Sequence, residues 1–366
     1  MRIALIRQRF AAFGGAERYM NLLIEHLSAR GHEIHVLANQ WDNVTTSGKV
    51  VWHRVPMIRT LSFLRALSFA LNSRKAVRSE HFDLVISLDR TLQQDIYRSA
   101  DGCHREYFAR RMQYASVLRR ARLRLNPLHY ILLWLEKRTY SEQNTRAVIA
   151  LSHRVKEEII RHYHFPAERI QVIHNGVDIE RFKLSSPRKN DGKFILFFVG
   201  SGFERKGLQF CVQALAKLPT NVELHVIGKG SIRRYQNLAK QLGVTNRVVF
   251  RGPVQDVEKI YSDADVLVHP AIYEPFGNVV LEAMACGIPV VAARFVGASE
   301  IIIHGKNGMI VQNPADIDEL ATAIRQLLDS KKLASMAVPA RETAEAHSIA
   351  RYVDQVLEVI ALLKKR

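Results

Sequence analysis

The chain has 366 residues, and at roughly 100–200 residues per domain this length favours two domains of similar size. Its composition, with 48% hydrophobic and 24% charged residues, excludes disordered, collagen-like and small disulfide-rich proteins. The net charge of +18 predicts a polyanionic partner, which leaves nucleic acid, an anionic membrane surface and a phosphorylated substrate open.

The charge is unevenly distributed along the chain. Residues 1–190 hold 32 basic and 17 acidic side chains, whereas residues 191–366 hold 21 and 18, so the first half carries nearly all of the excess. Cys103, Cys211 and Cys286 form no CxxC pair, which favours a reducing compartment over a disulfide framework or a structural zinc site. Because the sequence has neither a signal-peptide core nor about 18 consecutive apolar residues, we expect a cytoplasmic chain without a membrane span.

In chain order, short buried strands alternate with amphipathic helices. The first half predicts strands at residues 3–6, 34–37, 84–87 and 147–151, and helices at residues 16–29 and 154–163. A polar stretch of turn-forming residues, 183–192, is the predicted linker. The second half predicts strands at residues 194–199, 223–227, 247–250, 266–269, 289–292 and 309–311, with helices between them.

This alternation predicts an α/β protein with two doubly wound, Rossmann-like parallel sheets. We place the N-terminal domain at residues 1–185 and the C-terminal domain at residues 186–366, and we expect the last helix, about residues 348–364, to pack back on the N-terminal domain. Ligands of such sheets bind beyond the carboxyl ends of the strands. Two sheets facing across a cleft would therefore hold a substrate between them.

Two glycine-rich turns follow predicted strands and open predicted helices. Gly14 and Gly15 allow a backbone to approach an anion at a helix N-terminus, while the lack of a third glycine disfavours a nicotinamide cofactor. Residues 200–207 place Arg205 and Lys206 at the carboxyl end of a strand, where they suit a diphosphate, although the context is not that of a P-loop. The alternative to an anion site is a simple tight turn at Gly14 and Gly15, and a solvated basic turn at residues 200–207.

The stretch 273–291 contains the sharpest pattern. Glu274 lies in a loop before a helix that begins near Asn278, and Glu282 lies about one turn inside that helix. Carboxylates accept hydroxyl pairs of a sugar or a ribose, and the first N–H groups of a helix suit a phosphate. The alternative is two exposed glutamates eight positions apart.

Glu274 and Glu282 form an E-x7-E pattern, which the chain combines with Gly14-Gly15, Arg205-Lys206-Gly207 and His174-Asn175-Gly176-Val177-Asp178. With these motifs nearly the whole chain resembles a retaining GT-B glycosyltransferase of the group 1 (GT4) family. The order of Phe13-Gly14-Gly15, Asp101-Gly102-Cys103 and a following basic stretch is similar to that in enzymes of lipopolysaccharide core assembly.

The resemblance implies transfer of a hexose-type sugar from a nucleotide diphosphate, UDP by analogy, to a membrane-linked anionic glycolipid, with no metal and no cofactor beyond the donor. Glu282 would bind the ribose and Glu274 would bind the donor sugar. Asn278 departs from the family's pattern, in which an aliphatic residue is frequent at this position. The implied donor-binding residues are Gly14, Gly15, Arg205, Lys206, Gly228, Val254, Glu274, Phe276, Gly277, Asn278 and Glu282. Three of these residues would also be catalytic. Fixed cations stabilise the departing diphosphate, which is the role of Arg205 and Lys206, while Glu274 would hold the sugar that is transferred.

Asp101 is the fourth candidate catalytic residue, and it lies in an aperiodic stretch of the basic half. Neighbouring Arg98 and Arg105 would lower the pKa of its carboxyl group. A carboxylate with a low pKa is a weak base, so Asp101 is better suited to accept a hydrogen bond from the substrate hydroxyl than to deprotonate it. The alternative is a structural turn aspartate. His104 is the second choice, with a surface histidine as its alternative.

Between His104 and Arg138, nine basic residues stand against Glu106 and Glu136, with aromatic and aliphatic residues interleaved. This pattern predicts docking on an anionic membrane at its cytoplasmic face, or else a long solvated helix with residues 131–135 in the core.

Two rival functions stay open. A sugar-nucleotide epimerase of the same architecture would need no acceptor, and a nucleic-acid-binding protein is supported by charge alone, without a recognisable binding motif.

Overall fold

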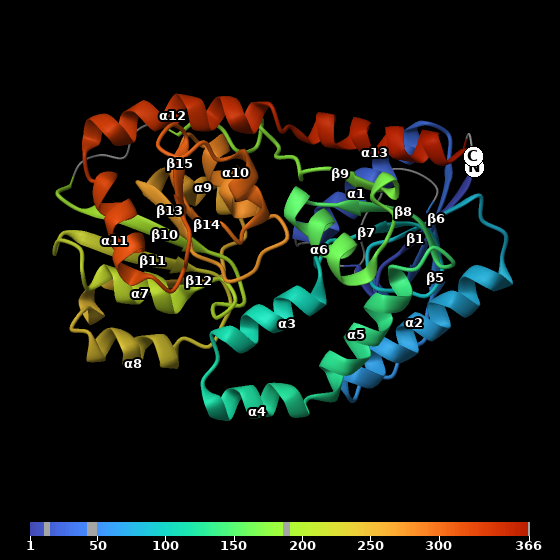
Figure 1. Ribbon diagram of the computed structural model, residues 1–366. Helices are drawn as coiled ribbons and strands as arrows, with labels where there is room; N and C mark the ends of the chain where they lie inside the picture. Colours follow the sequence, from blue (N-terminus) through green and yellow to red (C-terminus); the bar gives the residue numbers. More distant parts are fainter. Residues whose placement is uncertain (11–14, 42–49, 186–190, 365–366) are drawn as a thin grey trace. The chain divides into compact units, whose positions relative to one another are not determined.

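The computed structural model describes residues 1–10, 15–41, 50–185 and 191–364, which form two compact units (Figure 1). Unit 1 comprises Met1–Ile173 and Val353–Arg366, and unit 2 comprises His174–Tyr352. The chain enters unit 2 earlier than the predicted boundary after residue 185. The reason is local bonding, because Asn175 Nδ2 donates to Asn278 Oδ1 at 2.7 Å and Val177 N donates to His347 O at 2.9 Å.

Unit 1 is built on a seven-stranded parallel sheet of order β5-β3-β1-β6-β7-β8-β9. The chain adds strands outward from β1 and then returns to add the others from β6, so the β1/β6 junction is a topological switch point. The strands are β1 (Arg2–Ile6), β3 (Glu33–Ala38), β5 (Val50–Arg54), β6 (Leu84–Ser87), β7 (Gln94–Arg98), β8 (Thr145–Ala150) and β9 (Ile170–Val172). A separate pair joins β2 (Arg9–Phe10) to β4 (Gln40–Trp41).

Unit 2 contains a six-stranded parallel sheet of order β12-β11-β10-β13-β14-β15, with its switch point between β10 and β13. The central strands are continuous apolar runs that are buried on both faces, as parallel sheets require. The strands are β10 (Phe194–Val199), β11 (Val222–Ile227), β12 (Val248–Gly252), β13 (Val266–His269), β14 (Val290–Ala293) and β15 (Gly308–Val311).

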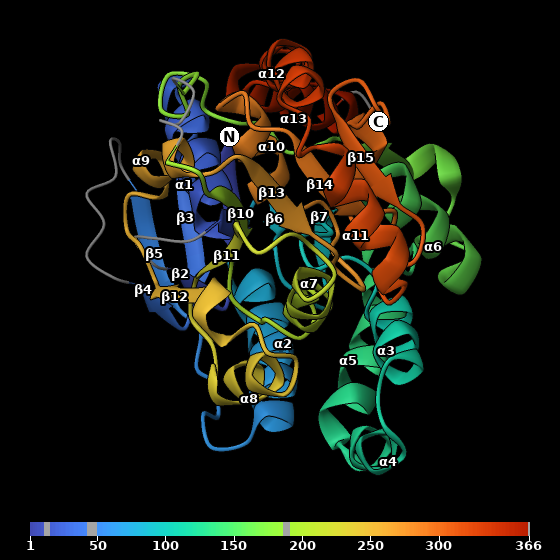
Figure 2. The ribbon, with the colours of Figure 1, turned by 90° about the vertical axis from the view of Figure 1, so that its left-hand side faces the viewer.

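Helices lie on both sides of each sheet (Figures 1 and 2). In unit 1 they are α1 (Gly15–Ala29), α2 (Ser62–Ser79), α3 (His104–Gln113), α4 (Val117–Leu125), α5 (Pro127–Thr139) and α6 (His153–Tyr163). In unit 2 they are α7 (Leu208–Leu215), α8 (Arg233–Gln241), α9 (Val257–Ile260), α10 (Asn278–Ala285), α11 (Ile317–Gln326) and α12 (Ser330–Glu345). The last helix, α13 (Ile349–Lys364), begins in unit 2, and from Val353 onward it belongs to unit 1. None of the described helices is both long and apolar enough to cross a membrane.

The predicted fold class, α/β with two doubly wound sheets, is confirmed. Each predicted strand is present, with ends shifted by at most two residues. The basic stretch after His104 is not one long helix. It is divided into α3, α4 and α5, and Asn126 caps α5 by accepting the Leu128 N–H at 3.0 Å, with Pro127 as the first helical residue.

Candidate functional site

The switch point of unit 2 brings together three of the predicted catalytic side chains. Arg205 and Lys206 follow β10, and Glu274 follows β13. Arg205 Nη1 lies 2.7 Å from Glu274 Oε2, and Lys206 Nζ lies 3.3 Å from the same oxygen. The Lys206 and Glu274 side chains are 11% and 13% exposed, so water screens their attraction only weakly.

Backbone contact between the two loops fixes this arrangement. Ile272 N donates to Arg205 O at 2.9 Å. Gly207 has a φ of +82°, and a Cβ atom at this position would lie 2.1 Å from Pro270 O. Only glycine tolerates both the left-handed conformation and the close approach, so Gly207 holds the two cations against the loop of Glu274.

The ionisation states follow from burial and charge. Burial by itself would raise the pKa of Glu274, but Lys206 and Arg205 hold it well below its ordinary value. Burial, with Lys206 adding to it, lowers the pKa of the adjacent His269 to about 4, so this imidazole is neutral at pH 7. Its Nε2 lies 3.7 Å from Glu274 Oε2. These four side chains therefore carry a net charge of +1, which favours an anionic ligand.

The start of α10 adds further predicted residues. Gly277, with a φ of +99°, precedes the helix and, being a glycine, offers no side chain of its own to cap the first N–H groups. Asn278 and Glu282 are four positions apart and lie on one face of α10. Tyr261, which sequence reasoning missed, donates its hydroxyl to Glu282 Oε2 at 3.3 Å. Buried Phe276 stacks on His174 with ring centroids 5.7 Å apart, so the run that begins at His174 contributes to this site.

Two more of the implied donor-binding residues, Gly228 and Val254, follow the neighbouring strands β11 and β12. Gly200 N donates to Ile227 O, and Gly228 N donates to Gly252 O, each at 2.8 Å. A Cβ atom on Gly228 would lie 2.3 Å from Gly200 O, so this approach also requires glycine. Val254, after β12, is 36% exposed.

The glycine pair of unit 1 is only partly described. Gly14 lies outside the described residues, while Gly15 is the first residue of α1. The role expected for this pair near the diphosphate therefore stays a prediction.

Asp101 lies in unit 1 and is 60% exposed. The structure pairs Asp101 with a cation other than the expected Arg98 and Arg105. Arg98 is buried with its guanidinium over the Tyr19 ring, and Arg105 donates its backbone N–H to Glu136. The cation beside Asp101 is Arg90, whose Nη1 lies 3.4 Å from Asp101 Oδ2.

Glu136, which sequence reasoning did not single out, anchors this region. Its fully buried carboxylate accepts hydrogen bonds from Arg90 Nε at 3.2 Å and Nη2 at 3.1 Å. It also accepts the backbone N–H groups of His104 at 2.6 Å and Arg105 at 3.1 Å, at the positive end of α3. Arg90 in turn donates to Gly102 O at 3.0 Å. Glu136 and Arg90 thus fix the turn that carries Asp101.

His104 is not a surface histidine. It is buried, and its Nε2 lies 3.0 Å from His129 Nδ1. Burial, with Arg90 adding to it, lowers the pKa of His104 to about 3. The ring is therefore neutral at pH 7, and its place as the second choice for the acceptor site stays a prediction.

A cavity of about 190 Å³ lies beside Asp101 at the β1/β6 switch point. Asp89 and Arg90, directly after β6, line it together with Gln8 and Arg65. Burial and the nearby Asp101 raise the pKa of Asp89, although Arg7 Nη1 lies 3.2 Å from its Oδ1. Asp89 and Arg90 lie two and three residues after the predicted strand 84–87, so the rule that ligands bind at switch points could have identified them from the sequence.

Comparison with known proteins identifies the family. The family Glycosyl transferases group 1 matches residues 180–343, and Glycosyltransferase Family 4 matches residues 13–181. The chain belongs to the group 1 (GT4) glycosyltransferases. Its two Rossmann-like units are those of the GT-B fold, as predicted. The two family matches meet near residue 180, close to the observed division of the enzyme into units.

Two relatives and one further solved structure are informative. The lipopolysaccharide glucosyltransferase WaaG of Escherichia coli (strain K12) is 26% identical over 377 residues, covering 98% of each chain. A crystal structure of WaaG matches with a TM-score of 0.85 and 25% identity, over 98% of this chain and 99% of that one. The lipopolysaccharide core biosynthesis glycosyltransferase LpsE of Rhizobium meliloti (strain 1021) is 35% identical over 158 residues, covering 43% of this enzyme and 45% of that protein. The Anabaena protein HepE, crystallised with UDP and glucose, matches with a TM-score of 0.74 and 23% identity over 98% and 99% of the two chains.

Proposed function

We propose that this glycosyltransferase moves a hexose-type sugar from a nucleoside diphosphate, UDP in preference, to an anionic, membrane-linked glycolipid of the lipopolysaccharide-core type, with retention of the donor's anomeric configuration. The observation that carries the proposal is the sheltered pairing of Arg205 and Lys206 with Glu274 at the β10/β13 switch point. Its net positive charge suits a diphosphate, and its carboxylate suits sugar hydroxyls.

The proposed step separates charge. When the bond between the anomeric carbon and the phosphate oxygen breaks, positive charge grows on the sugar and negative charge on the departing diphosphate. Arg205 and Lys206, together with the first N–H groups of α10, would stabilise the departing group more strongly than the intact donor. Glu274 would hold the donor sugar, and Glu282, aligned by Tyr261, would hold the ribose.

A panel of nucleotide sugars tests the donor assignment. The HepE structure holds UDP, which favours UDP-sugars as donors. Both relatives named above act in lipopolysaccharide synthesis according to their names, which favours an acceptor of that kind. We expect slow hydrolysis of one or more UDP-hexoses by the purified full chain without acceptor, and faster consumption when a truncated lipopolysaccharide is added. Preferential turnover of an ADP- or GDP-sugar would contradict the UDP assignment.

The acceptor side rests on unit 1. Asp101 and Asp89 line the cavity at its switch point, and either carboxylate can accept a hydrogen bond from the acceptor hydroxyl. We expect Asp101→Asn to slow transfer while leaving donor hydrolysis unchanged. A variant that transfers at the wild-type rate would make Asp101 a structural turn residue.

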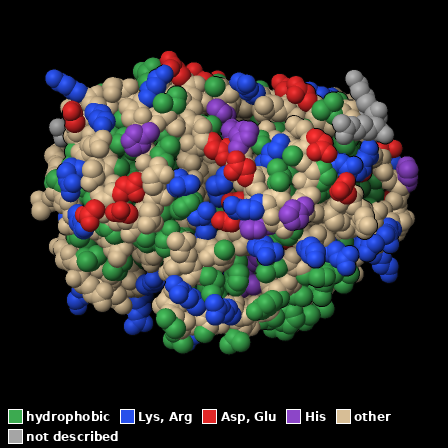
Figure 3. Space-filling view, viewed as in Figure 1, with side chains coloured by type: hydrophobic (Ala, Val, Ile, Leu, Met, Phe, Trp, Pro, Cys, Tyr) green, Lys and Arg blue, Asp and Glu red, His purple; other side chains and the backbone are tan. Residues whose placement is uncertain are grey.

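Helix α4 supports membrane docking. Val117, Leu118 and Leu125 are 82%, 67% and 81% exposed, while Leu123 is the buried contact of the helix. Leu118 and Leu125 are seven positions apart and share one face. Along the lower edge of the view in Figure 3, where Figure 1 places α4 and α5, basic and apolar side chains lie next to one another. Such a surface can insert aliphatic groups at a lipid interface while its arginines meet phosphates.

Liposome sedimentation tests this surface. Near an anionic bilayer each arginine contributes about 1 kcal/mol, so we expect Arg119, Arg122 and Arg124 changed together to Gln to abolish sedimentation with anionic vesicles at low salt. Arg120 is kept, because its side chain donates to Met112 O and Gln113 O and holds the turn between α3 and α4. The matched control changes three exposed cations of unit 2, Arg233, Lys240 and Lys331, to Gln. Equal loss of binding in both variants would point to net charge rather than to α4.

Two other functions predict different outcomes. An epimerase would convert a nucleotide sugar without any acceptor, so product analysis in the absence of lipopolysaccharide separates it from a transferase. A nucleic-acid-binding protein would be stabilised by duplex DNA more than by a UDP-sugar, which a comparison of melting temperatures reveals. We expect the UDP-sugar alone to raise the melting temperature.

A further inference from the structure

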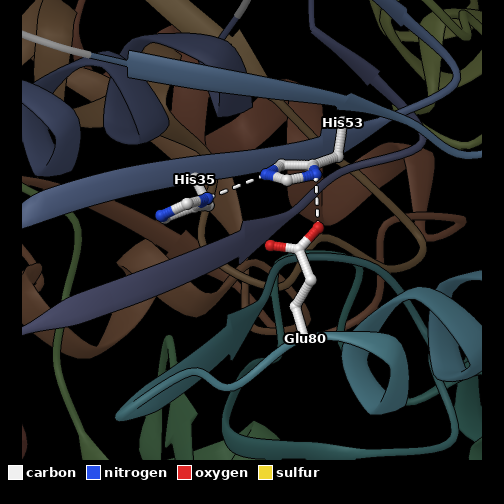
Figure 4. A group of neighbouring side chains, drawn as sticks. All are labelled: His35, His53 and Glu80. Atoms are coloured by element: carbon white, nitrogen blue, oxygen red, sulfur yellow. Dashed lines mark hydrogen bonds and ion pairs between the residues drawn. The ribbon is translucent and has the colours of Figure 1, made fainter.

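A second cluster of polar side chains lies in unit 1 on the edge strands β3 and β5. His35 pairs with Val51 across these strands and Leu37 pairs with His53, so both histidines project from the same face of the sheet. Together with Glu80, directly after α2, they place three possible metal-ligand atoms within 4.8 Å of one another (Figure 4). The sequence predicted no metal site here because the three residues are far apart along the chain.

The imidazoles form a chain that has a carboxylate at each end. His35 Nε2 lies 3.0 Å from Glu33 Oε1, and His53 Nδ1 lies 3.0 Å from Glu80 Oε1. Between the rings, His35 Nδ1 and His53 Nε2 are 2.8 Å apart, as the dashed line in Figure 4 shows. An ionised carboxylate only accepts hydrogen bonds, so the outer nitrogen of each ring carries the proton.

This arrangement leaves the inner nitrogens of two neutral rings with lone pairs that face each other. A cation between them removes the conflict, and the cation is either a shared proton or a metal ion. Histidines that bind metals characteristically donate their other N–H to a carboxylate, which fixes the ring and raises its basicity. Glu33 and Glu80 already occupy those positions.

The surroundings favour an added cation and allow it to enter. Arg2 Nη2 lies 3.4 Å from Glu80 Oε2, and Arg2 Nε lies 3.9 Å from Glu33 Oε2. With both imidazoles neutral, one guanidinium and two carboxylates sum to −1. His35 is 2% exposed, but the side chains of His53 and Glu80 are 22% and 35% exposed, so the open side of the cluster faces solvent.

We propose that His35 Nδ1 and His53 Nε2 bind a transition-metal ion of the Zn²⁺ class, with Glu33 and Glu80 orienting the rings and water completing the coordination. Imidazole nitrogens suit Zn²⁺, Ni²⁺ and Cu²⁺. At a Zn–N distance of about 2.0–2.1 Å, tetrahedral geometry places the two nitrogens about 3.3 Å apart. The nitrogens would therefore separate by about half an ångström, and the rings would turn so that their lone pairs converge on the ion. The ion would tie the edge strand β5 to β3 and stabilise unit 1, with no part in the transfer reaction.

Zinc titration of the EDTA-treated full chain tests the site. All three tryptophans, Trp41, Trp52 and Trp134, belong to unit 1, so tryptophan fluorescence follows the unfolding of that unit. We expect one Zn²⁺ per chain by calorimetry and a melting temperature raised by about 5–10 °C at a hundredfold excess over Kd, reversed by EDTA. The same zinc should leave the rate of donor hydrolysis unchanged.

Three variants assign the ligands. His53→Gln should abolish the binding event, and Glu80→Gln should weaken it by about 10–100-fold through the loss of an orienting carboxylate. The matched control is His81→Gln, which changes an 87% exposed histidine of the same loop and should bind zinc as wild type does. If His53→Gln does not fold, the zinc affinity of Glu80→Gln alone tests the proposal. Zinc binding that persists in His53→Gln or keeps full affinity in Glu80→Gln would overturn the proposal, as would a wild-type chain that binds no zinc because a proton occupies the site.

Discussion

Replacing Glu136 with alanine removes the carboxylate that links Arg90 to the start of α3. Arg90 would keep its buried charge without its main counterion, and truncating one partner of a buried ion pair costs about 3–5 kcal/mol. The backbone N–H groups of His104 and Arg105 would lose their acceptor, which adds about 1–3 kcal/mol where water does not replace it. We expect the free energy of unfolding of unit 1 to fall by about 4–8 kcal/mol, a large part of the roughly 5–15 kcal/mol of a typical domain.

Urea unfolding followed by tryptophan fluorescence measures this loss, because the fluorescence reports on unit 1. The matched control is Glu142→Ala, since Glu142 is 57% exposed and its 3.2 Å ion pair with Arg169 should contribute no more than about 1 kcal/mol. The milder Glu136→Gln keeps the shape and removes the charge, so its cost should fall between the two. If Glu136→Ala were no less stable than Glu142→Ala, the assignment of Glu136 as the anchor of the Asp101 turn would be refuted.

Three further expectations concern the donor, the reaction and the pH dependence of stability. Glu282→Ala should raise the Kd for UDP by about 10–100-fold by calorimetry, because a hydrogen bond to a charged group contributes about 1.5–3 kcal/mol; an unchanged Kd would remove Glu282 from the site. Transfer should be insensitive to EDTA and retain the anomeric configuration, and NMR that detected an inverted product would contradict the second point. The folded pKa of His104, about 3, lies below the unfolded value of about 6.5, so the unfolded chain takes up the proton first. The contribution of His104 to stability is then greatest above pH 6.5 and falls as the pH drops toward 3, by about 1.4 kcal/mol per pH unit. In urea unfolding measured between pH 7 and 4, His104→Gln should therefore reduce the slope of stability against pH.

Where hydrophobic periodicity was clear, the sequence was sufficient to predict the elements. Central strands such as β10 and β13 are continuous apolar runs, and burial on both faces in a parallel sheet leaves few other solutions. Of the strands without a prediction, β2, β4 and β9 have only two or three residues, and β5 and β7 carry polar residues. In addition, β5 and β9 lie at the edges of their sheet. Local composition does not distinguish such strands from loops.

The candidate donor site was predictable for a topological reason. Arg205, Lys206 and Glu274 all follow strands, and strand order alone brings the carboxyl ends of β10 and β13 together. The network around Asp101 was not predictable. Glu136 stands in an otherwise apolar and basic stretch, and its role depends on α5 packing against the start of α3, which no spacing in the sequence encodes.

The most direct test of the central claim is the rate of UDP release from the UDP-sugar that the panel selects, measured for the wild type and for Lys206→Ala. The account predicts that kcat falls by about 100–1,000-fold while the Kd for the donor changes much less, because Lys206 acts mainly on the departing diphosphate. Lys217→Ala, which removes an exposed lysine 2.6 Å from Asp318, should keep the wild-type rate. Equal turnover by the wild type and Lys206→Ala would contradict the placement of the transfer chemistry at the β10/β13 switch point.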